Sequence, residues 1–599
     1  MMAIVCIPPR CSFCRFEFCI GTTIVTIHKN DTLSRQFPYG TDSTHLSITY
    51  TQCHRACRHH GENGGLAVAC HSECIKFLPH QSWKFSQALL YSFEPPFSQE
   101  KRRVAWLRSS LISNLKMPCD LPYEIKSNIA QNLLREYAVV KARSCWVDAR
   151  EFQKSTDLCI NPSKTVWARY IEFEGVKYIA SITNEPSDGH ETLFKPSSSS
   201  RVDYVYISED HLGIRQMVFS PSQAPTVPPL PGIWWRILPI PPSGCQLCGK
   251  TDGIKLRSLA STGTDDLAST CNIAWDIPPT TLEVMAYERT RWLATLPYRM
   301  VGFCEALGRI DGINSAMRMR MASFQCNSPT TTGYSFCWNV SLRFVHAHTA
   351  GEDLSFYGSI DRPFEEKNIW FYVPMHPSEY ITHVWKRHRQ NERELALIIE
   401  TNAGRKVVVG PHLRPNWPSC RWTLLSTFQP NPSRIFFEDS PHGIRCLAFE
   451  TPSPNQYNRP LILPFPISPF PKSTSIEDYF YTSAVLDNVV EVTPCRTVQS
   501  GVWAITGILL SYANGYQIAV GQVRLDHLSP TMRVLPSQKM TFTFSAVNGY
   551  PYLASIHSAP PMCSETDMEI CWHGSLEWWF SRRQCKIYHN GQASPVTKF

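Results

Sequence analysis

The part of the chain that most constrains its fold is the region after residue 150, which has the pattern of β-strands almost to its end. Stretches that alternate apolar and polar residues, or are rich in β-branched and aromatic residues, recur throughout it. The clearest are residues 166–182, 202–207, 214–219, 395–410 and 505–521. The pattern predicts a mainly β fold of repeated antiparallel hairpin units, of β-prism, sandwich or propeller type. A small Cys/His-rich module and a short helical segment precede it.

An internal repeat is visible within this β region. Residues 395–410 align without gaps on residues 506–521, so that Gly404 falls on Gly515. Both stretches have Asn and Gly at their centre, which supply the positive φ angles of a tight hairpin turn. Each is therefore predicted to be a strand, a turn and a second strand.

A second repeated feature is a Gly-Ile-Arg strand at Gly213 and again at Gly443. The first lies 38 residues after Gly175 and the second 39 residues after Gly404, both within predicted hairpin turns. These separations indicate a repeated unit of hairpin, long loop and strand. The alternative to a true repeat is a chance similarity, because any two strand–turn–strand stretches look alike.

The length of the chain predicts several domains. At 599 residues it is too long for one core, and roughly 150 residues per domain gives an expectation of about four. The predicted parts are a Cys/His-rich module at 1–82, a helical element at 83–150, a β-rich region at 151–450 and a second β-rich region at 451–599. Pro-rich stretches at 220–242 and 459–471 carry large apolar residues and are expected to be packed extended segments.

Charge and hydropathy favour neither a nucleic-acid partner nor a membrane. The net charge of +8 is small for this length, and the densest basic runs are only residues 101–103 and 386–393. The longest apolar stretch, residues 501–521, is broken by Asn514 and Gln517 and is too short to cross a bilayer. We therefore expect no nucleic acid and no membrane among the partners.

The cysteines indicate a reducing compartment. The chain has 23 of them, and its first residues lack an apolar run long enough for a signal peptide, since Pro8 and Pro9 interrupt it. The thiols are then expected to be free or metal-bound rather than paired, in the cytoplasm or nucleus.

The N-terminal module has the residues of a zinc site. It contains one Cys-x2-Cys pair and two Cys-x3-Cys pairs, with His54, His59, His60 and His71 among them. Cys-x2-Cys suits zinc because one turn can aim two thiolates at tetrahedral positions, and a Cys-x3-Cys or Cys-His pair at the start of a helix can close the site. The predicted ligands of a structural zinc ion are Cys11, Cys14, Cys53 (or His54), Cys57, Cys70 and Cys74. The alternative is a Cys-rich segment with buried free thiols.

Motifs of enzyme classes were sought without success. The sequence has no Gly-x-Ser-x-Gly, phosphate-binding Gly-rich loop, dinucleotide fingerprint or His-Glu-x-x-His. Cys245 and Cys248 lack a matching pair, so a turn is predicted there. His346 and His348 have strand spacing that puts both imidazoles on one face, but with no third ligand in view we expect a solvent-facing edge. The chain is predicted to have no catalytic residues.

Residues 121–146 resemble the first half of an F-box. The family pattern is Leu-Pro-x-Glu-Ile, apolar residues at helical spacing and a Trp near the end. The matching residues are Leu121, Pro122, Glu124, Ile125, Ile129, Leu133, Leu134, Val139 and Trp146. The resemblance implies that Leu121, Pro122, Ile125, Ile129 and Leu133 bind a Skp-type adaptor of a cullin ubiquitin ligase. The alternative is an ordinary amphipathic helix behind a Leu-Pro start.

The order of the parts carries a wider resemblance. A Cys/His-rich head, an F-box-like helix and a long β region ending in residues 574–585 are similar to a group of uncharacterised proteins of filamentous fungi. Such groups are often encoded in variable subtelomeric clusters, which implies an accessory role. The expected function is therefore protein–protein interaction without catalysis, with the helix binding an adaptor and the β region binding an unknown target.

Residues 378–411 resemble part of the jacalin-like lectins, which implies carbohydrate binding as the rival function. The Gly-x-x-x-Asp loop of those lectins is missing after residues 442–449, where it would be expected. The Trp pairs at 234–235 and 578–579 would suit stacking on a sugar if they were exposed, but we expect them in the core.

Overall fold

The structure is a computed structural model of the whole chain. Strands hold 48% and helices 14% of the residues that it describes, which confirms the predicted mainly β fold. The described residues are 3–28, 31–45, 48–52, 67–78, 82–115, 121–152, 157–196, 202–220, 225–226, 230–240, 245–262, 273–278, 292–293, 319–339, 341–361, 368–388, 395–415, 420–439, 443–444, 446–451, 461–463, 465–472, 477–499, 501–558 and 564–595. The chain forms two compact units. The first unit comprises residues 1–284 and 299–321, and the second comprises residues 285–298 and 322–599. The finer domain boundaries stay predictions.

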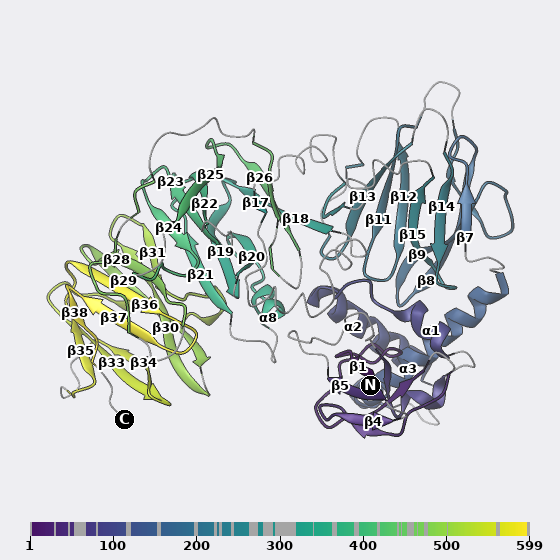
Figure 1. Cartoon of the computed structure of the whole chain (residues 1–599), viewed down its shortest axis with the longest axis horizontal. Coiled ribbons are helices and arrows are strands. Elements are labelled where there is room, and N and C mark those ends of the chain that lie inside the picture. Colours follow the sequence, from purple (N-terminus) through teal and green to yellow (C-terminus); the bar gives the residue numbers. More distant parts are fainter. Residues whose placement is uncertain are drawn as a thin grey trace. The chain divides into compact units, whose positions relative to one another are not determined.

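The first unit begins with two small sheets (Figure 1). Their strands are β1 (Ala3–Ile7), β2 (Thr23–Ile27), β3 (Phe37–Pro38), β4 (Ser43–His45), β5 (Ile48–Gln52) and β6 (Val68–His71). One sheet has the order β1-β5-β4, with β1 and β5 parallel, and the other is antiparallel with the order β3-β2-β6. A short 3₁₀-helix, η1 (Cys74–Phe77), follows β6 after a two-residue turn.

Three helices follow, over the segment predicted to be helical. They are α1 (Ser82–Leu89), α2 (Phe97–Asn114) and α3 (Tyr123–Phe152). Pro96 precedes α2 and Pro122 precedes α3, because the fixed φ and missing N–H of proline fit the first turn of a helix. The Pro122 carbonyl accepts the first helical hydrogen bonds of α3, at 3.1 Å.

A single core joins the small sheets to the helices. Phe13, from the turn after β1, stacks on Phe85 of α1 with ring centroids 5.7 Å apart. The ring centroids of Phe85 and Trp146 of α3 are 5.3 Å apart, and Phe173 of the next sheet belongs to the same core. The described residues of the N-terminal module and of the helical element therefore share one core.

The rest of the first unit consists mainly of antiparallel sheets around a second core. Its strands are β7 (Asp157–Ile160), β8 (Val166–Phe173), β9 (Val176–Thr183), β10 (Glu191–Phe194), β11 (Tyr204–Glu209), β12 (Ile214–Ser220), β13 (Trp234–Pro239), β14 (Leu247–Thr251), β15 (Leu256–Ser261) and β16 (Ile273–Trp275). The sheet orders are β10-β8-β9, β15-β14-β7 and β12-β11-β13-β16, and β16 also pairs in parallel with residues 319–321 of β18 (Met319–Cys326). Alternate residues of these strands point inward and form the core, among them Ile179, Ile207 and Leu256.

The second unit is built almost wholly of antiparallel sheets. Its strands are β17 (Trp292–Leu293), β19 (Thr331–Asn339), β20 (Ser341–Thr349), β21 (Ile369–Pro374), β22 (Ile381–His388), β23 (Leu395–Thr401), β24 (Lys406–Val409), β25 (Arg421–Thr427), β26 (Ser433–Glu438), β27 (Cys446–Phe449), β28 (Phe480–Val485), β29 (Val489–Gln499), β30 (Val502–Tyr512), β31 (Gln517–Gly521), β32 (Met532–Arg533), β33 (Met540–Val547), β34 (Tyr550–His557), β35 (Asp567–Ile570), β36 (Ser575–Phe580), β37 (Cys585–His589) and β38 (Gln592–Ala593). β18 (Met319–Cys326) begins in the first unit and ends in the second. Two short helices, α8 (Phe356–Ile360) and η3 (Leu525–His527), interrupt the strands.

The strands of the second unit enclose one large core. The sheet orders are β20-β19-β21, β24-β23-β22-β25, β26-β27-β17, β28-β36-β37-β38 and β32-β29-β30-β34-β33-β35, with β31 paired to β30. Aromatic residues of different sheets meet in this core. Phe480, for example, stacks on Phe580 with ring centroids 5.6 Å apart and packs edge-on against Phe371.

Both predicted hairpins of the internal repeat are present with the same register. In the first, Leu397 pairs with Val409, and in the second Ile508 pairs with Val520, which are the equivalent positions of the alignment. The turns place Gly404 at φ 78° and Gly515 at φ 83°, as a tight hairpin requires.

The burial of individual side chains tests two further predictions, on the Trp pairs and on a Pro-rich segment. Both Trp pairs, in β13 and β36, are buried, which confirms that they belong to the core. The Pro-rich segment before β28 was expected to be packed, and this is wrong for Ile462, Phe465 and Ile467, which are 70%, 85% and 78% exposed. Among the described residues, no helix is long and apolar enough to cross a bilayer.

Candidate metal centre

The first half of the site is the turn that follows β1 and carries Cys11 and Cys14. The backbone N–H of Arg15 donates to the Cys11 carbonyl at 2.9 Å, and the N–H of Cys11 donates to the Phe16 carbonyl at 3.0 Å. Arg15 has a φ of 63°, a left-handed conformation that closes the turn tightly. Two thiols three residues apart are thereby directed to the same side.

The second half of the site is the junction between β6 and η1. His71 is the last residue of β6, and Cys74 is the first residue of η1. Two hydrogen bonds fix this junction against the first turn: the Ser12 N–H donates to the Ala69 carbonyl at 2.8 Å, and the Ala69 N–H donates to Ser12 Oγ at 3.2 Å. The backbone therefore brings together two pairs of side chains that are far apart in sequence.

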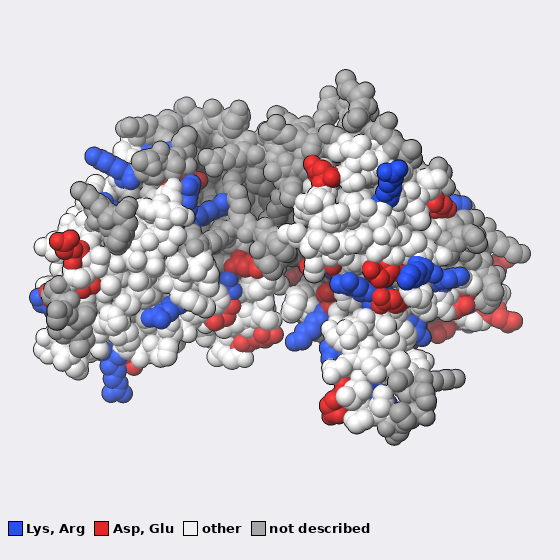
Figure 2. All heavy atoms as spheres, turned by 90° about the horizontal axis from the view of Figure 1, so that it is seen from below, with Lys and Arg blue, Asp and Glu red and all other residues white. Residues whose placement is uncertain are grey.

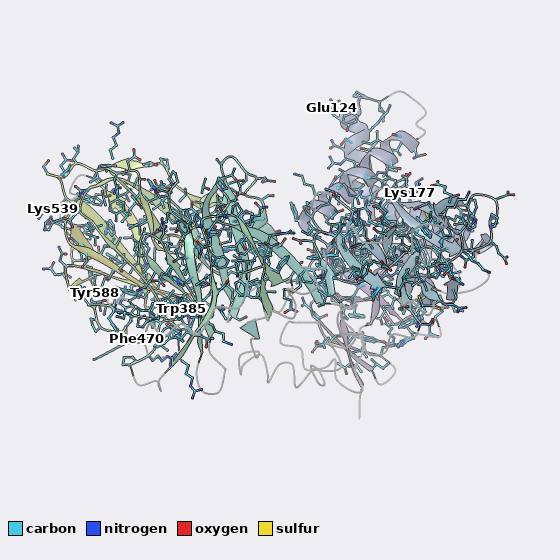
Figure 3. All side chains as sticks on the ribbon, turned by 90° about the horizontal axis from the view of Figure 1, so that it is seen from above. Glu124, Lys177, Trp385, Phe470, Lys539 and Tyr588 are labelled. Atoms are coloured by element: carbon cyan, nitrogen blue, oxygen red, sulfur yellow. The ribbon has the colours of Figure 1, made fainter. Side chains whose placement is uncertain are left out.

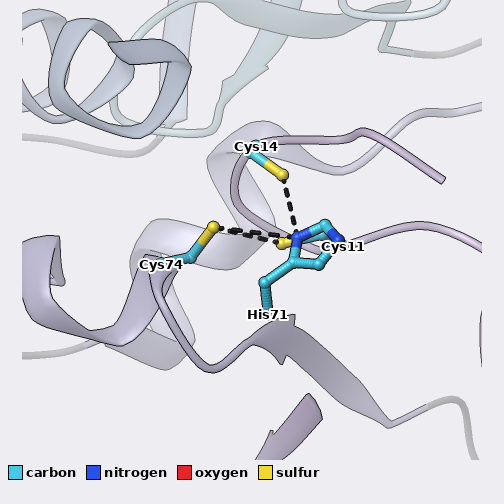
Figure 4. Close-up of side chains that lie close together, drawn as sticks. All are labelled: Cys11, Cys14, His71 and Cys74. Atoms are coloured by element: carbon cyan, nitrogen blue, oxygen red, sulfur yellow. Dashed lines mark hydrogen bonds between the residues drawn. The ribbon is translucent and has the colours of Figure 1, made fainter. Parts of the chain in front are cut away.

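The four ligand atoms have the spacing of a tetrahedral metal site (Figure 4). Cys14 Sγ lies 3.3 Å and Cys74 Sγ 3.8 Å from His71 Nδ1, and the Sγ atoms of Cys11 and Cys74 are 3.9 Å apart. All four atoms lie within 4.8 Å of one another. With Zn–S and Zn–N bonds of about 2.3 and 2.0 Å, tetrahedral geometry separates two sulfurs by about 3.8 Å and sulfur from nitrogen by about 3.5 Å. The group could therefore hold a metal ion.

The site is buried, and its thiols interact strongly. Burial and hydrogen bonding to the Cys11 sulfur raise the pKa of Cys14 well above its usual value, and the pKa of Cys74 is raised chiefly by hydrogen bonds to Cys11 and Cys14. Although burial opposes it, hydrogen bonds from the neighbouring thiols and His71 hold the pKa of Cys11 well below its usual value. Cys11 is thus the thiol that deprotonates most readily, and a bound cation would stabilise the other sulfurs as thiolates as well.

Charged residues around the site anchor its first turn. Arg103 of α2 donates from Nη2 to the Cys14 carbonyl at 2.6 Å and from Nε to Glu174 Oε2 at 2.8 Å. Glu174, in the turn between β8 and β9, also pairs with Arg15 directly after Cys14. The three side chains are buried, so this network holds the ligand turn against both the helices and the following sheet.

The structure brings together three of the predicted ligands. Cys11, Cys14 and Cys74 lie in the metal-capable group. Cys70 is buried but outside that group, because neighbouring residues of a strand point to opposite faces and His71 faces the site. Cys53 and Cys57, with the alternative ligand His54, lie outside the described residues.

The residue of the metal-capable group that the sequence analysis does not assign as a ligand is His71. It is named there only among the histidines of the module, and Cys70 is assigned as the partner of Cys74. The pair His71-x2-Cys74 has the same two-residue gap as Cys11-x2-Cys14, and this symmetry was the available signal. Cys245 and Cys248 are in no metal-capable group of the described residues.

A second group lies in the second unit. His346 and His348 project from β20, and Glu352, three residues beyond the strand, completes a group that could hold a metal ion. The sequence did not reveal this third residue. The expectation of a solvent-facing edge is wrong for His348, whose side chain is 1% exposed. His348 is buried because α8 packs over the end of the strand, where the rings of Phe356 and His346 stack with centroids 4.2 Å apart.

The residues that resemble an F-box lie at the start of α3 and are poorly buried. Ile125 and Leu133 are 45% and 41% exposed, Pro122 is exposed, and Leu121 and Ile129 are half-buried. Figure 3 shows Glu124 at the tip of this helix, which extends away from the strands of its unit. The side chains at this end of α3 are therefore largely exposed.

Comparison with known proteins places the chain in no family: no protein-family model and no curated protein matches it. The site must then be interpreted from its own residues. Acidic and basic side chains are interspersed on the face of the molecule in Figure 2, without a single-sign patch.

Proposed function

We propose that the chain is a protein–protein interaction protein in which a zinc-stabilised N-terminal module presents helix α3 to a partner. The observation that carries this proposal is a stripe of exposed apolar residues along α3. Its members are Ile125, Ile129, Leu133, Val140 and Val147, of which all but Ile129 are at least 41% exposed.

The stripe lies opposite the buried face of the same helix. At 3.6 residues per turn, its five positions fall within about 80° of one another. Leu134, Ala138 and Ala142, on the other side, are buried in the core of the unit. A surface helix ordinarily has one apolar face and one polar face, so a second apolar stripe indicates a binding surface.

The partner that fits best is a Skp-type adaptor of a cullin ubiquitin ligase. The N-terminal part of the stripe consists of the F-box-like positions Ile125, Ile129 and Leu133. Leu121 and Pro122, which are also F-box-like positions, directly precede the helix. An apolar helix face of this kind binds in a hydrophobic groove through residues at i, i+4 and i+8. In this proposal the β-rich second unit holds the target.

Recovery of the adaptor from solution tests this directly. Purified full-length chain is mixed with a purified Skp-type adaptor, and the variant Ile125→Ala/Leu133→Ala is compared with the wild type. We expect binding to fall by at least about tenfold, because each exposed side chain is worth about 1 kcal/mol or more at an interface. The control is Val498→Ala/Leu535→Ala, which removes two equally exposed apolar side chains of the second unit. Absence of binding by the wild type would contradict the proposal.

The metal in this proposal is a structural zinc ion held by Cys11, Cys14, His71 and Cys74. Three thiolates and one imidazole with no open position are typical of structural zinc. The ligands are part of the same core as Phe85 and the helices, so the ion would fix the base on which α3 rests.

Metal content tests the zinc assignment. We expect the full-length chain to contain zinc by elemental analysis, and Cys14→Ser and His71→Ala each to remove one equivalent. Cys19→Ser is the matched control, since Cys19 is an exposed thiol in the same module. Equal zinc content in Cys14→Ser and the wild type would refute the assignment.

Carbohydrate binding is the second candidate, and one observation favours it. Trp503 on β30 is 67% exposed and faces a cross-strand neighbour, Val498, that is also exposed. An exposed indole on a flat sheet can stack on a sugar ring. Retention on a glycan array, lost in Trp503→Ala, would favour this function over adaptor binding.

A further inference from the structure

The group formed by His346, His348 and Glu352 has the distances of a metal site as well. His346 Nε2 lies 3.1 Å from both carboxylate oxygens of Glu352, and His348 Nδ1 is in direct contact with one of them. Ligands that bind one ion at about 2.0–2.2 Å lie about 2.9–3.5 Å apart. The three atoms all fall within 4.8 Å of one another.

The charge of Glu352 is not balanced by a basic side chain. Within the described part of the chain, its polar partners are the two imidazoles and Thr349, whose N–H donates to Oε2 at 3.2 Å. Its side chain is only 17% exposed, so solvent screens it incompletely. Either a proton on a histidine or a bound cation must compensate a carboxylate in this position.

The second nitrogen of His348 is held in the way that metal ligands are held. Its Nε2 lies 2.7 Å from Ser335 Oγ, which lies 2.7 Å from the hydroxyl of Tyr357. Both of these residues are buried. If Nε2 carries the proton and donates to Ser335, Nδ1 presents a lone pair toward the Glu352 carboxylate, and a cation between the two acceptors relieves their repulsion.

We propose that His346, His348 and Glu352 form a second metal site, for a divalent transition-metal ion. Two imidazoles and one carboxylate suit zinc, iron(II) or manganese(II), and three protein ligands leave positions for water or another oxygen ligand. The side chain of His346 is 29% exposed, so solvent reaches the group from its side. This site differs in kind from the Cys11–Cys74 group, which supplies four ligands and is fully buried.

Titration of the full-length, metal-free chain with cobalt(II) distinguishes the two sites. Cobalt bound to thiolates gives an intense sulfur-to-metal charge-transfer band, and cobalt bound to nitrogen and oxygen gives only the weaker visible bands. We expect the wild type to bind two equivalents, one of each kind. Glu352→Gln should lose only the equivalent without the thiolate band, and Cys14→Ser only the equivalent with it.

Two further variants keep the test decisive. His557→Ala removes an exposed histidine of the same unit and should leave both equivalents bound. Ser335→Ala removes only the hydroxyl that positions His348 and should weaken the second equivalent by about 10–100-fold. If the wild type bound only the equivalent with the thiolate band, or if a folded Glu352→Gln variant gave an unchanged titration, the proposal would be overturned and a hydrogen-bonded His–Glu–His group would remain.

Discussion

At the scale of single residues, Glu174 shows how a charge is accommodated in the first unit. It is buried between Arg15 and Arg103. Burial alone would raise its pKa, but the two guanidinium groups lower it below the usual 4.5. The pairing therefore stabilises the fold at neutral pH, and this contribution is lost as the pH falls through the lowered pKa.

Glu174→Gln is expected to destabilise the first unit by about 3 kcal/mol, because it leaves two buried guanidinium groups without their counter-charge. Urea unfolding at neutral pH measures this loss. The control is Glu191→Gln, which breaks an exposed ion pair with Lys177 and should change the free energy of unfolding by less than about 0.5 kcal/mol. Equal effects of the two variants would contradict the account of the network.

Lys255 should make stability depend on pH at alkaline values. Burial lowers its pKa from 10.5 to about 8, although Asp252 opposes the shift. Between these two values the unfolded chain binds more protons than the folded chain, so stability should rise with pH across this window. In Lys255→Met the free energy of unfolding should rise less with pH across this window, as measured by urea unfolding at several pH values. Parallel curves for the two proteins would show that Lys255 is not the cause.

The residues of the candidate site could be predicted only in part. Cys11 and Cys14 follow from a local spacing, and their turn is formed by residues next to each other in sequence. The choice of His71 over Cys70 depends on which face of β6 meets the turn, and that face is fixed by the pairing of β6 with β2. Glu352 likewise lies beside His346 only because of the turn after β20, and no spacing rule predicts the path of that turn.

At the scale of elements, the repeated hairpins offer a direct comparison. Gly404 and Gly515 have nearly the same positive φ, and an added Cβ at either would meet no atom within 4 Å. Gly404→Ala and Gly515→Ala should therefore each cost only the backbone strain, about 1 kcal/mol. Chemical denaturation of both variants checks this, and clearly unequal costs would mean that the two turns are not equivalent.

Gly521→Ala is the informative contrast in the same hairpin. Its φ of 80° is almost that of Gly515, but an added Cβ would overlap the Thr506 carbonyl and lie 3.1 Å from the Trp578 ring. The expected loss is therefore larger, by about 1–3 kcal/mol, because the backbone cannot move away in a packed core. A cost equal to that of Gly515→Ala would show that the strands relax.

Hairpins were predictable and sheets were not, for the same physical reason. The strands and turn of residues 395–410 and 506–521 are specified by neighbouring residues, as is the helical spacing of α3. The pairing of β28 with β36 joins residues almost a hundred positions apart, and the choice among many strand edges depends on the whole core. The Pro-rich segment before β28 was misjudged because apolar composition does not reveal whether a partner strand is present.

At the scale of the whole molecule, the two compact units have separate cores. The core that contains Cys11 and Cys74 consists of residues from the first unit alone, and the core around Phe480 consists of residues from the second unit alone. Units with their own cores unfold as separate cooperative blocks. The full chain should then unfold in two transitions, one for each unit.

Calorimetry is expected to resolve two unfolding transitions, which two variants assign. Cys14→Ser removes a ligand from the core of the first unit and should lower one transition temperature. Gly521→Ala strains the core of the second unit and should lower the other. Additivity follows because the two sites share no core, so the double variant should shift both transitions by the sum of the single effects. A single transition that both variants lower would instead mean that the units unfold together, and the proposed zinc ion would then stabilise the whole chain rather than the first unit alone.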